Sequence, residues 1–86
     1  MAANRARMKR EVLRREMIAT FNLLVDAVAL EKHFDCAYAR QPSDDALQQW
    51  KLCRRTVTQV GQDYARALSR YRMAVRVNFA SRRSGA

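Results

Sequence analysis

The stretch "ARQPSDDAL" (residues 39–47) decides the fold, because it holds the only strong break in the chain. Pro42 disfavours a helical conformation at Gln41, so a helix that reaches this point should end there. Ser43 or Asp44 can cap a following helix, whose positive dipole end also favours the two adjacent carboxylates. The stretch therefore predicts a short connection between two helices.

Little else in the chain would interrupt a helix. Its 86 residues include two Gly and one Pro, whereas a sheet protein of this size needs many turn-forming residues. The length suits one small domain. We expect a single all-α domain over residues 1–86, with helices at about 5–39 and 44–79, a turn at 40–43 and a basic tail at 80–86.

The first predicted helix carries two apolar stripes. Side chains at spacings of three and four residues form one stripe of Leu13, Met17, Phe21, Leu24 and Val28, and another of Leu23, Ala27, Leu30, Phe34 and Tyr38. A helix that packs against one neighbour needs only one apolar face. Two stripes therefore indicate two neighbours.

The second predicted helix has one apolar series, which comprises Trp50, Cys53, Val57, Val60, Tyr64, Leu68, Tyr71 and Val75. A fold at the turn makes the helices antiparallel and gives these neighbours: Phe21 with Tyr64, Leu24 with Gly61, and Val28 with Val57. Gly61 on this face would let the two backbones approach closely. Its helix propensity is about 1 kcal/mol less favourable than that of Ala.

A hairpin of this size buries too little apolar surface to be stable alone. Two hairpins that form a four-helix bundle would cover the second stripe, so we expect a homodimer. The predicted core and dimer contacts are Phe21, Leu24, Val28, Leu30, Phe34, Trp50, Val57, Tyr64, Leu68 and Tyr71.

The formal net charge is +9 and the sequence pI is near 10.8, which favours a polyanionic partner. Fourteen of the 17 basic residues are arginine, whose planar fork of donors suits phosphate. GC-rich coding or an overlapping reading frame would also explain the arginine excess. A basic protein that docks on an acidic protein is the other interpretation.

The second predicted helix separates charge from the apolar series. At 100° per residue, its basic and small polar side chains fall opposite that series, along about 37 Å from Lys51 to Arg76. Asp63 lies only at the edge of this strip. The predicted nucleic-acid contacts are Lys51, Arg54, Arg55, Thr58, Gln62, Arg66, Ser69 and Arg70.

Duplex RNA is the nucleic acid that this arrangement favours. Single-strand binders stack bases on exposed aromatic rings, but Trp50, Tyr64 and Tyr71 fall on the apolar side. A long basic helix suits recognition of duplex shape through phosphates and 2′-hydroxyls, and Thr58 and Gln62 could serve those hydroxyls. The pattern does not exclude DNA.

Other functional classes find no support in the sequence. His33 is the only histidine, and Cys36 and Cys53 form no metal-binding motif or disulfide framework, so we expect no metal, cofactor or small-molecule substrate. No nucleophile and base are paired, which argues against an enzyme. No apolar run approaches the roughly 20 residues of a membrane span. Free cysteines indicate a reduced, cytoplasmic setting.

The order of parts resembles the nodavirus-type suppressors of RNA silencing. The resemblance covers the turn "RQPSDDAL" (40–47), the helix start "WKLCRRTV" (50–57) and the later segment "RMAVRVNFA" (72–80). It implies a dimeric four-helix bundle in the host-cell cytoplasm that shields duplex RNA from a dicing nuclease and sequesters small interfering duplexes.

The resemblance assigns the RNA contacts to Cys53, Arg54, Arg55, Thr58, Gln62 and Arg66. The basic run near the N-terminus, residues 5–15, departs from that family. An additional RNA contact is one interpretation of this run, and a different role is the other. A helical-hairpin chaperone or adaptor that binds an acidic helical partner protein is the alternative function.

Overall fold

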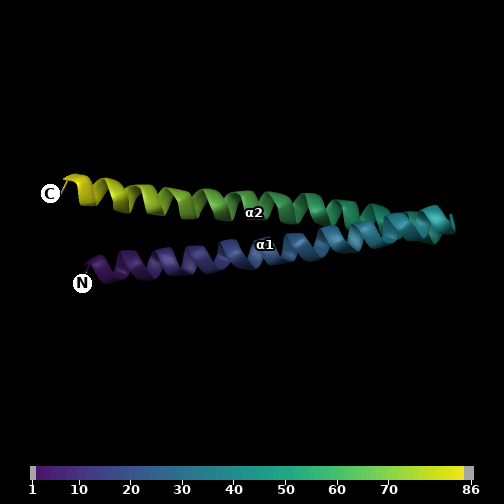
Figure 1. The fold of residues 1–86 in the computed structure, drawn as a ribbon, viewed down its shortest axis with the longest axis horizontal. Coiled ribbons are helices and arrows are strands. Elements are labelled where there is room, and N and C mark those ends of the chain that lie inside the picture. The colour runs from purple at the N-terminus through teal and green to yellow at the C-terminus, as the bar shows by residue number, and fades with distance from the viewer. Residues whose placement is uncertain (1, 85–86) are drawn as a thin grey trace.

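The chain forms an antiparallel hairpin of two helices, which confirms the all-α prediction. The computed structural model describes the backbone of residues 2–84 and the side-chain environments of residues 4–77. Helix α1 (Ala2–Arg40) and helix α2 (Asp44–Ser84) pack against each other in a rod of 64 × 18 × 13 Å (Figure 1). The turn closes one end of the rod, and both chain ends lie at the other, open end.

Backbone and cap hydrogen bonds define the turn. The Gln41 amide donates to the Ala37 carbonyl at 3.0 Å and closes the last turn of α1. The Ala46 amide donates to Ser43 Oγ at 3.1 Å, so Ser43 is the N-cap of α2. Asp44 and Asp45 occupy the first turn of α2, where the positive end of the helix dipole favours them.

Both helices are longer than the sequence suggested. Helix α2 continues to Ser84 instead of ending near residue 79, so residues 80–84 of the predicted tail are helical. Helix α1 begins at Ala2 instead of near residue 5. Neither extension contains Gly or Pro, the two residues that disfavour a helix interior most strongly.

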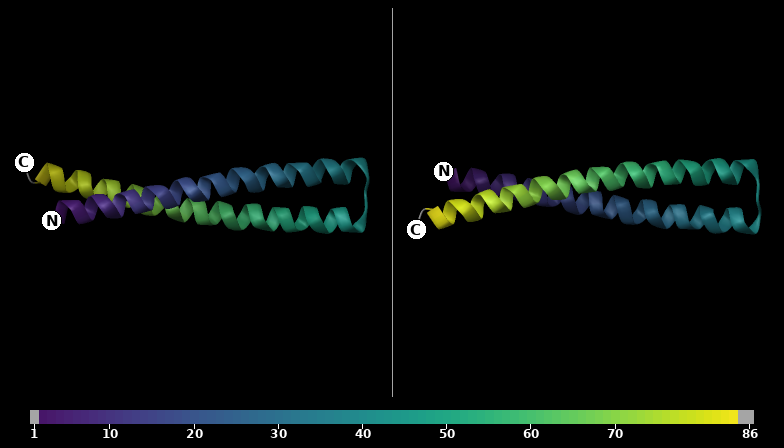
Figure 2. Two further views of the ribbon diagram at one scale, coloured as in Figure 1. Left: turned by 90° about the horizontal axis from the view of Figure 1, so that it is seen from below. Right: turned by 90° about the horizontal axis from the view of Figure 1, so that it is seen from above.

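The less exposed side chains repeat every seven residues along both helices. We call them the seam: Leu13, Met17, Thr20, Leu24, Ala27, Glu31, Phe34 and Tyr38 on α1, with Trp50, Cys53, Val57, Val60, Tyr64, Ala67, Tyr71 and Ala74 on α2. Alternating steps of three and four residues are the pattern of a coiled coil. The two ribbons accordingly cross in the side views of Figure 2 instead of running straight.

The predicted helix register agrees with the contacts between the two helices. The rings of Phe21 and Tyr64 lie 5.6 Å apart between centroids, at a tilt of 54°. Leu24 lies beside Gly61, as expected from the position of the turn. The turn thus sets which residues of α1 meet which residues of α2.

The predicted core is only partly covered within one hairpin. Seven of its members are half-buried on or beside the seam, namely Leu24, Phe34, Trp50, Val57, Tyr64, Leu68 and Tyr71. Phe21, Val28 and Leu30 remain 48%, 46% and 51% exposed. These three side chains need a further partner if they are to be buried.

The deepest side chains are small, and the sequence pattern missed one of them. Ala67 and Cys53 are 5% and 8% exposed, whereas Val75 of the predicted series is 39% exposed. The prediction followed 3.6 residues per turn and passed from Tyr64 to Leu68. The coiled coil repeats every 3.5 residues, so its seam passes to Ala67 instead.

The hairpin has very little interior. Its accessible surface is 7205 Å², whereas a compact chain of 10.0 kDa would expose about 5,200 Å². Its radius of gyration is 19.1 Å, against about 12 Å for a compact domain of this length. Among the described side chains, only Cys53 and Ala67 are buried.

Gly61 does not allow an unusually close approach of the two helices, which corrects the prediction from sequence. A Cβ atom at this position would lie 3.9 Å from Leu24 Cδ1, an ordinary van der Waals distance. Gly61 has a helical backbone without positive φ, so alanine fits its conformation. Within one hairpin, Gly61 therefore only weakens the helix.

Replacing Gly61 by Ala should raise the free energy of unfolding by about 0.5–1 kcal/mol, because alanine has the higher helix propensity and meets no clash. Urea denaturation at fixed protein concentration measures the change. Ala65→Gly, at an exposed site on the same helix, is the matched control and should lower stability by a similar amount. A loss of stability in Gly61→Ala would instead place a second chain against this position.

Candidate nucleic-acid interface

All eight side chains predicted to bind nucleic acid are exposed on α2. They do not form one uniform strip, because the seam fixes which direction each of them faces. Arg55, Gln62 and Ser69 recur every seven residues, so they keep one orientation along the supercoil. We call these three residues, with Lys51, Thr58 and Arg66 beside them, the α2 basic strip.

Arg54 is held at the side of α2 that adjoins α1. Its Nε lies 3.9 Å from Glu31 Oε1, and its guanidinium carbon lies 5.0 Å from the centre of the Trp50 ring. Glu31 occupies a seam position on α1, so this ion pair joins the two helices. Arg54 therefore faces α1 and adds a weak contact to the hairpin. Its side chain is 61% exposed and remains accessible to a ligand, so its contact with nucleic acid stays a prediction.

Thr58 has a local role that leaves it able to accept a hydrogen bond. Its hydroxyl donates to the Arg54 carbonyl at 3.1 Å, a common arrangement for threonine inside a helix. The hydroxyl oxygen keeps acceptor capacity. Because Thr58 is exposed, a donor from a ligand can reach that oxygen.

One acid lies close to the α2 basic strip. Asp63 Oδ1 accepts from Gln59 Nε2 at 3.2 Å and lies 3.9 Å from Arg66 Nη1. The Arg66 side chain is 63% exposed, so this ion pair is worth well under 1 kcal/mol. A stronger anion can therefore compete with Asp63 for Arg66.

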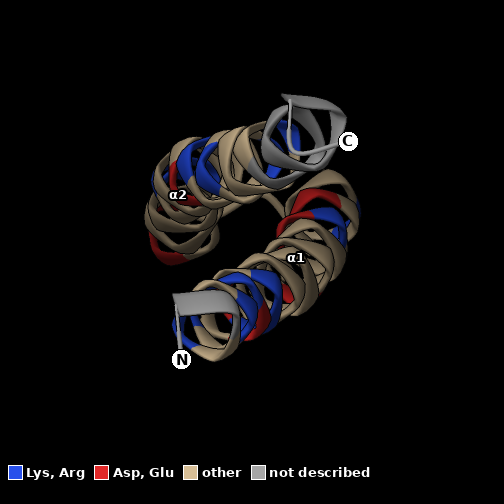
Figure 3. Cartoon of the chain, turned by 90° about the vertical axis from the view of Figure 1, so that its left-hand side faces the viewer, with Lys and Arg blue, Asp and Glu red and all other residues tan. Residues whose placement is uncertain are grey.

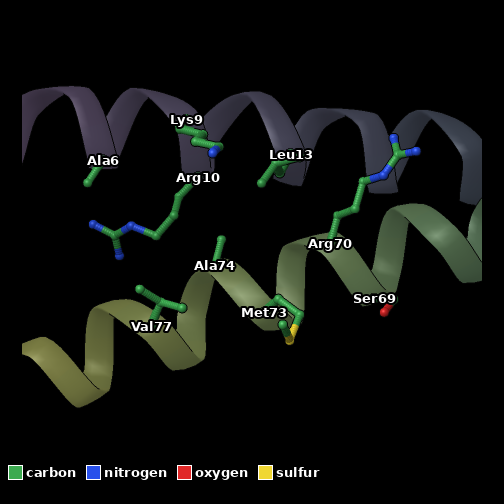
Figure 4. Close-up of a pocket in the computed structure, with 9 residues that line it drawn as sticks. All are labelled: Ala6, Lys9, Arg10, Leu13, Ser69, Arg70, Met73, Ala74 and Val77. Carbon is green, nitrogen blue, oxygen red and sulfur yellow. The ribbon is translucent and has the colours of Figure 1, made fainter.

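Arg70 and its neighbour Ser69 border a groove that the other six predicted contact residues do not line. The groove has a volume of about 580 Å³ and lies between the helices at the open end, where Lys9 and Arg10 of α1 also line it. In Figure 4 the Arg70 guanidinium reaches toward α1, while the Ser69 side chain points away from it. The apolar lining of this groove consists of Ala6, Leu13, Met73, Ala74 and Val77.

The sequence reasoning included Arg10 in the N-terminal basic run but missed its position on the seam. Arg10 lies seven residues before Met17, which places it at a seam position where an apolar residue is usual. It is half-buried, and its Nε is buried without a hydrogen-bond partner in the described part of the chain. A heptad count from Met17 would have identified this exception.

Cys53 does not fit the contact role that the resemblance implied. It is a free thiol and 8% exposed in the seam, so it packs between the helices. Cys36 is also free, and it is exposed on α1. Among the described residues, no cluster of His, Cys, Asp and Glu could hold a metal ion.

The described helices also contain no segment long and apolar enough to cross a membrane.

Comparisons of the chain with protein-family models, curated proteins and solved structures give no match. The resemblance to the silencing suppressors therefore stays a prediction. The structure itself defines a class, an antiparallel coiled-coil hairpin with an exposed basic face.

Substitutions at the adjacent Arg54 and Arg55 show which of the two side chains stabilises the hairpin. Arg54→Ala should lower the free energy of unfolding by about 0.5–1 kcal/mol, because it loses the contacts with Glu31 and Trp50. Arg55→Ala should change it by less than about 0.5 kcal/mol, as is usual for an exposed surface side chain. Urea denaturation measures both, and equal losses would contradict this assignment.

Proposed function

We propose that the chain binds double-stranded RNA along the α2 basic strip, without reading base sequence, and acts as a homodimer. The observation that carries this proposal is an exposed row of Lys, Arg, Gln, Ser and Thr along one side of a long helix. From Lys51 to Ser69 this row extends about 27 Å at 1.5 Å per residue. Such a row suits contacts with successive phosphates and sugars.

The charge pattern supports a polyanion over solvent as the partner of this row. Solvated helix surfaces usually alternate acidic and basic side chains at i,i+4, which adds a little stability. Here Lys51 and Arg55 repel each other across one turn, as do Arg66 and Arg70. A ligand that carries regularly spaced negative charge would remove that repulsion.

The position of the aromatic rings supports a duplex over a single strand. Trp50, Tyr64 and Tyr71 are half-buried at the seam, so their faces are not free to stack on unpaired bases. Duplex RNA offers 2′-hydroxyls as well as phosphates. The exposed Thr58, Gln62 and Ser69 could hydrogen bond to these hydroxyls, which favours RNA over DNA.

The biological role follows from sequence-independent binding and from the resemblance. A protein that lies along duplex RNA would block access by a dicing nuclease and hold small interfering duplexes. This is suppression of RNA silencing, and it would take place in the cytoplasm of a host cell if the protein is viral. The proposal involves neither catalysis nor a cofactor.

An unusual apolar stripe on α1 supports the homodimer. Ile18, Phe21, Val25 and Val28 follow each other at steps of three, four and three residues, and they are 40–51% exposed. They adjoin the seam, since Phe21 contacts Tyr64. On the other flank of α1, Asp26 lies between the exposed Leu23 and Leu30, so that side is less suited to burial. This corrects the dimer stripe expected from the sequence, because its Ala27, Phe34 and Tyr38 already lie on the seam of one hairpin.

A second copy is the occupant that this stripe fits best. The thin interior of one hairpin leaves much of its apolar surface in water, and burial of a further stripe would add to the core of both copies. A pair of hairpins packed through these stripes forms a four-helix bundle. Each copy would then present its own α2 basic strip.

The alternative function is a hairpin adaptor that binds an acidic helical protein. The apolar groove at the open end favours it, because Lys9, Arg10 and Arg70 surround an apolar lining. An acidic amphipathic helix has the complementary chemistry. If the wild-type chain binds an acidic amphipathic helix but does not bind duplex RNA, this alternative is favoured.

Duplex RNA binding should weaken steeply as salt increases, because phosphate contacts release counterions. Arg55→Ala with Arg66→Ala should lower the affinity about tenfold and reduce the slope of log affinity against log salt by about 1.4–1.8. Gel-shift titrations with duplex RNA, duplex DNA and single strands measure this. Lys32→Ala with Arg40→Ala on α1 is the control and should have little effect. No measurable duplex binding at about 100 mM salt would contradict the proposed function.

Sedimentation equilibrium at micromolar concentration should give about twice the 10.0 kDa chain mass. Val25→Asp should shift the equilibrium to the monomer, because it places a charge in the proposed dimer contact. Ala19→Asp introduces the same residue on another exposed side of α1 and should leave the dimer intact. A monomeric wild-type chain, or equal effects of both substitutions, would rule out this interface.

A further inference from the structure

The net charge of the chain lies at one end of the hairpin. Residues 26–59, which form the half beside the turn, hold five basic and five acidic side chains. The two segments of the open half, 1–25 and 60–86, hold twelve basic and three acidic side chains and so carry the whole net charge of +9. The register that places Leu24 beside Gly61 brings these segments together.

Part of the excess positive charge of the open half lies on the N-terminal part of α1. Six basic residues lie between positions 5 and 15. Arg5 lies in the first turn of α1, which contains no acid. Helix dipoles favour anions in the first turn and disfavour cations there. Figure 3, which looks onto the open end, shows Lys and Arg on both helices. The open half is thus electrostatically unfavourable unless an anion binds there.

A polar pocket at this end joins the two helices. Its volume is about 130 Å³, and its lining consists of Arg7, Arg10, Glu11 and Arg14 of α1 with Tyr71 and Val75 of α2. Glu11 Oε2 lies 3.9 Å from Arg14 Nη1, so the carboxylate partly neutralises one of the three guanidinium groups. The pocket still holds two positive charges more than negative charges.

Arg10 is the side chain that marks this pocket as a ligand site. Arg10 lines both this pocket and the larger groove, and Figure 4, a view of that groove, shows its guanidinium between α1 and α2. Its Nε is buried and has no hydrogen-bond partner in the described part of the chain. Burial of a charged donor without an acceptor is unfavourable, and native proteins rarely leave it so. An oxyanion in the pocket would supply the missing acceptor.

We propose that Arg7, Arg10 and Arg14 form a second phosphate-binding site, separate from the α2 basic strip, which takes backbone phosphates of nucleic acid. Phosphate suits the pocket because guanidinium forks bind two of its oxygens, and the Tyr71 hydroxyl can donate a further hydrogen bond. Nucleic acid is the source that fits best, because the pocket shares the open half with Arg66 and Arg70. This choice of source rests on the proposed function.

Inorganic tripolyphosphate tests the pocket without RNA. At constant ionic strength it should shift the Nε–Hε resonance of Arg10 in the NMR spectrum, and the shift should saturate. Arg7→Gln with Arg14→Gln should weaken this binding at least fivefold. Lys32→Gln with Arg40→Gln, which removes two charges from the neutral half of the same helix, should leave it within twofold. An unshifted Arg10 resonance, or equal weakening in both double variants, overturns the site.

Duplex RNA tests the source of the phosphate. Arg7→Gln with Arg14→Gln should reduce the salt slope of RNA binding by about 1.4–1.8, as expected for two lost phosphate contacts, while the control pair leaves it unchanged. An unchanged slope overturns nucleic acid as the ligand of this pocket. If wild-type protein binds no duplex RNA, the proposed function fails, whereas the tripolyphosphate titration still decides for or against the pocket.

Discussion

The heptad seam between α1 and α2 is the constraint on which the rest of the structure depends. Cys53 and Ala67 are its deepest side chains, and the larger seam residues stay only half-buried, so the two helices enclose little volume. A seam of this kind holds two helices in register without forming a large core. It also fixes the outward direction of every other residue on α2.

Because the seam covers only one face of each helix, several large apolar side chains of α1 remain outside it. Ile18, Phe21, Val25 and Val28 lie beside the seam of α1, where a single hairpin cannot cover them. The proposed assembly and the proposed ligand binding are therefore linked. If two copies pack through these stripes, their α2 helices hold fixed positions, and two basic strips can act on one duplex.

Charge is distributed along the hairpin as well as around each helix. The half beside the turn is electrically neutral, and it contains the interhelical pair of Arg54 and Glu31. The open half holds the excess of arginine, the unpartnered Arg10 Nε and the polar pocket beside it. The α2 basic strip spans both halves, since Lys51 and Arg55 lie beside the turn and Arg66 lies in the open half, whereas the proposed second phosphate site lies only in the open half.

The sequence by itself determined the two helices, the turn at Pro42 and the pairing of Phe21 with Tyr64, because these depend on local conformation and on chain length from the turn. It also indicated which side chains of α2 are exposed. Only the tertiary structure decided that Ala67 lies deeper than Leu68, since supercoiling changes the repeat from 3.6 to 3.5 residues. The roles of Arg54 and Arg10 likewise depend on which side chains the opposite helix brings near, and a helical wheel of one segment contains no such information.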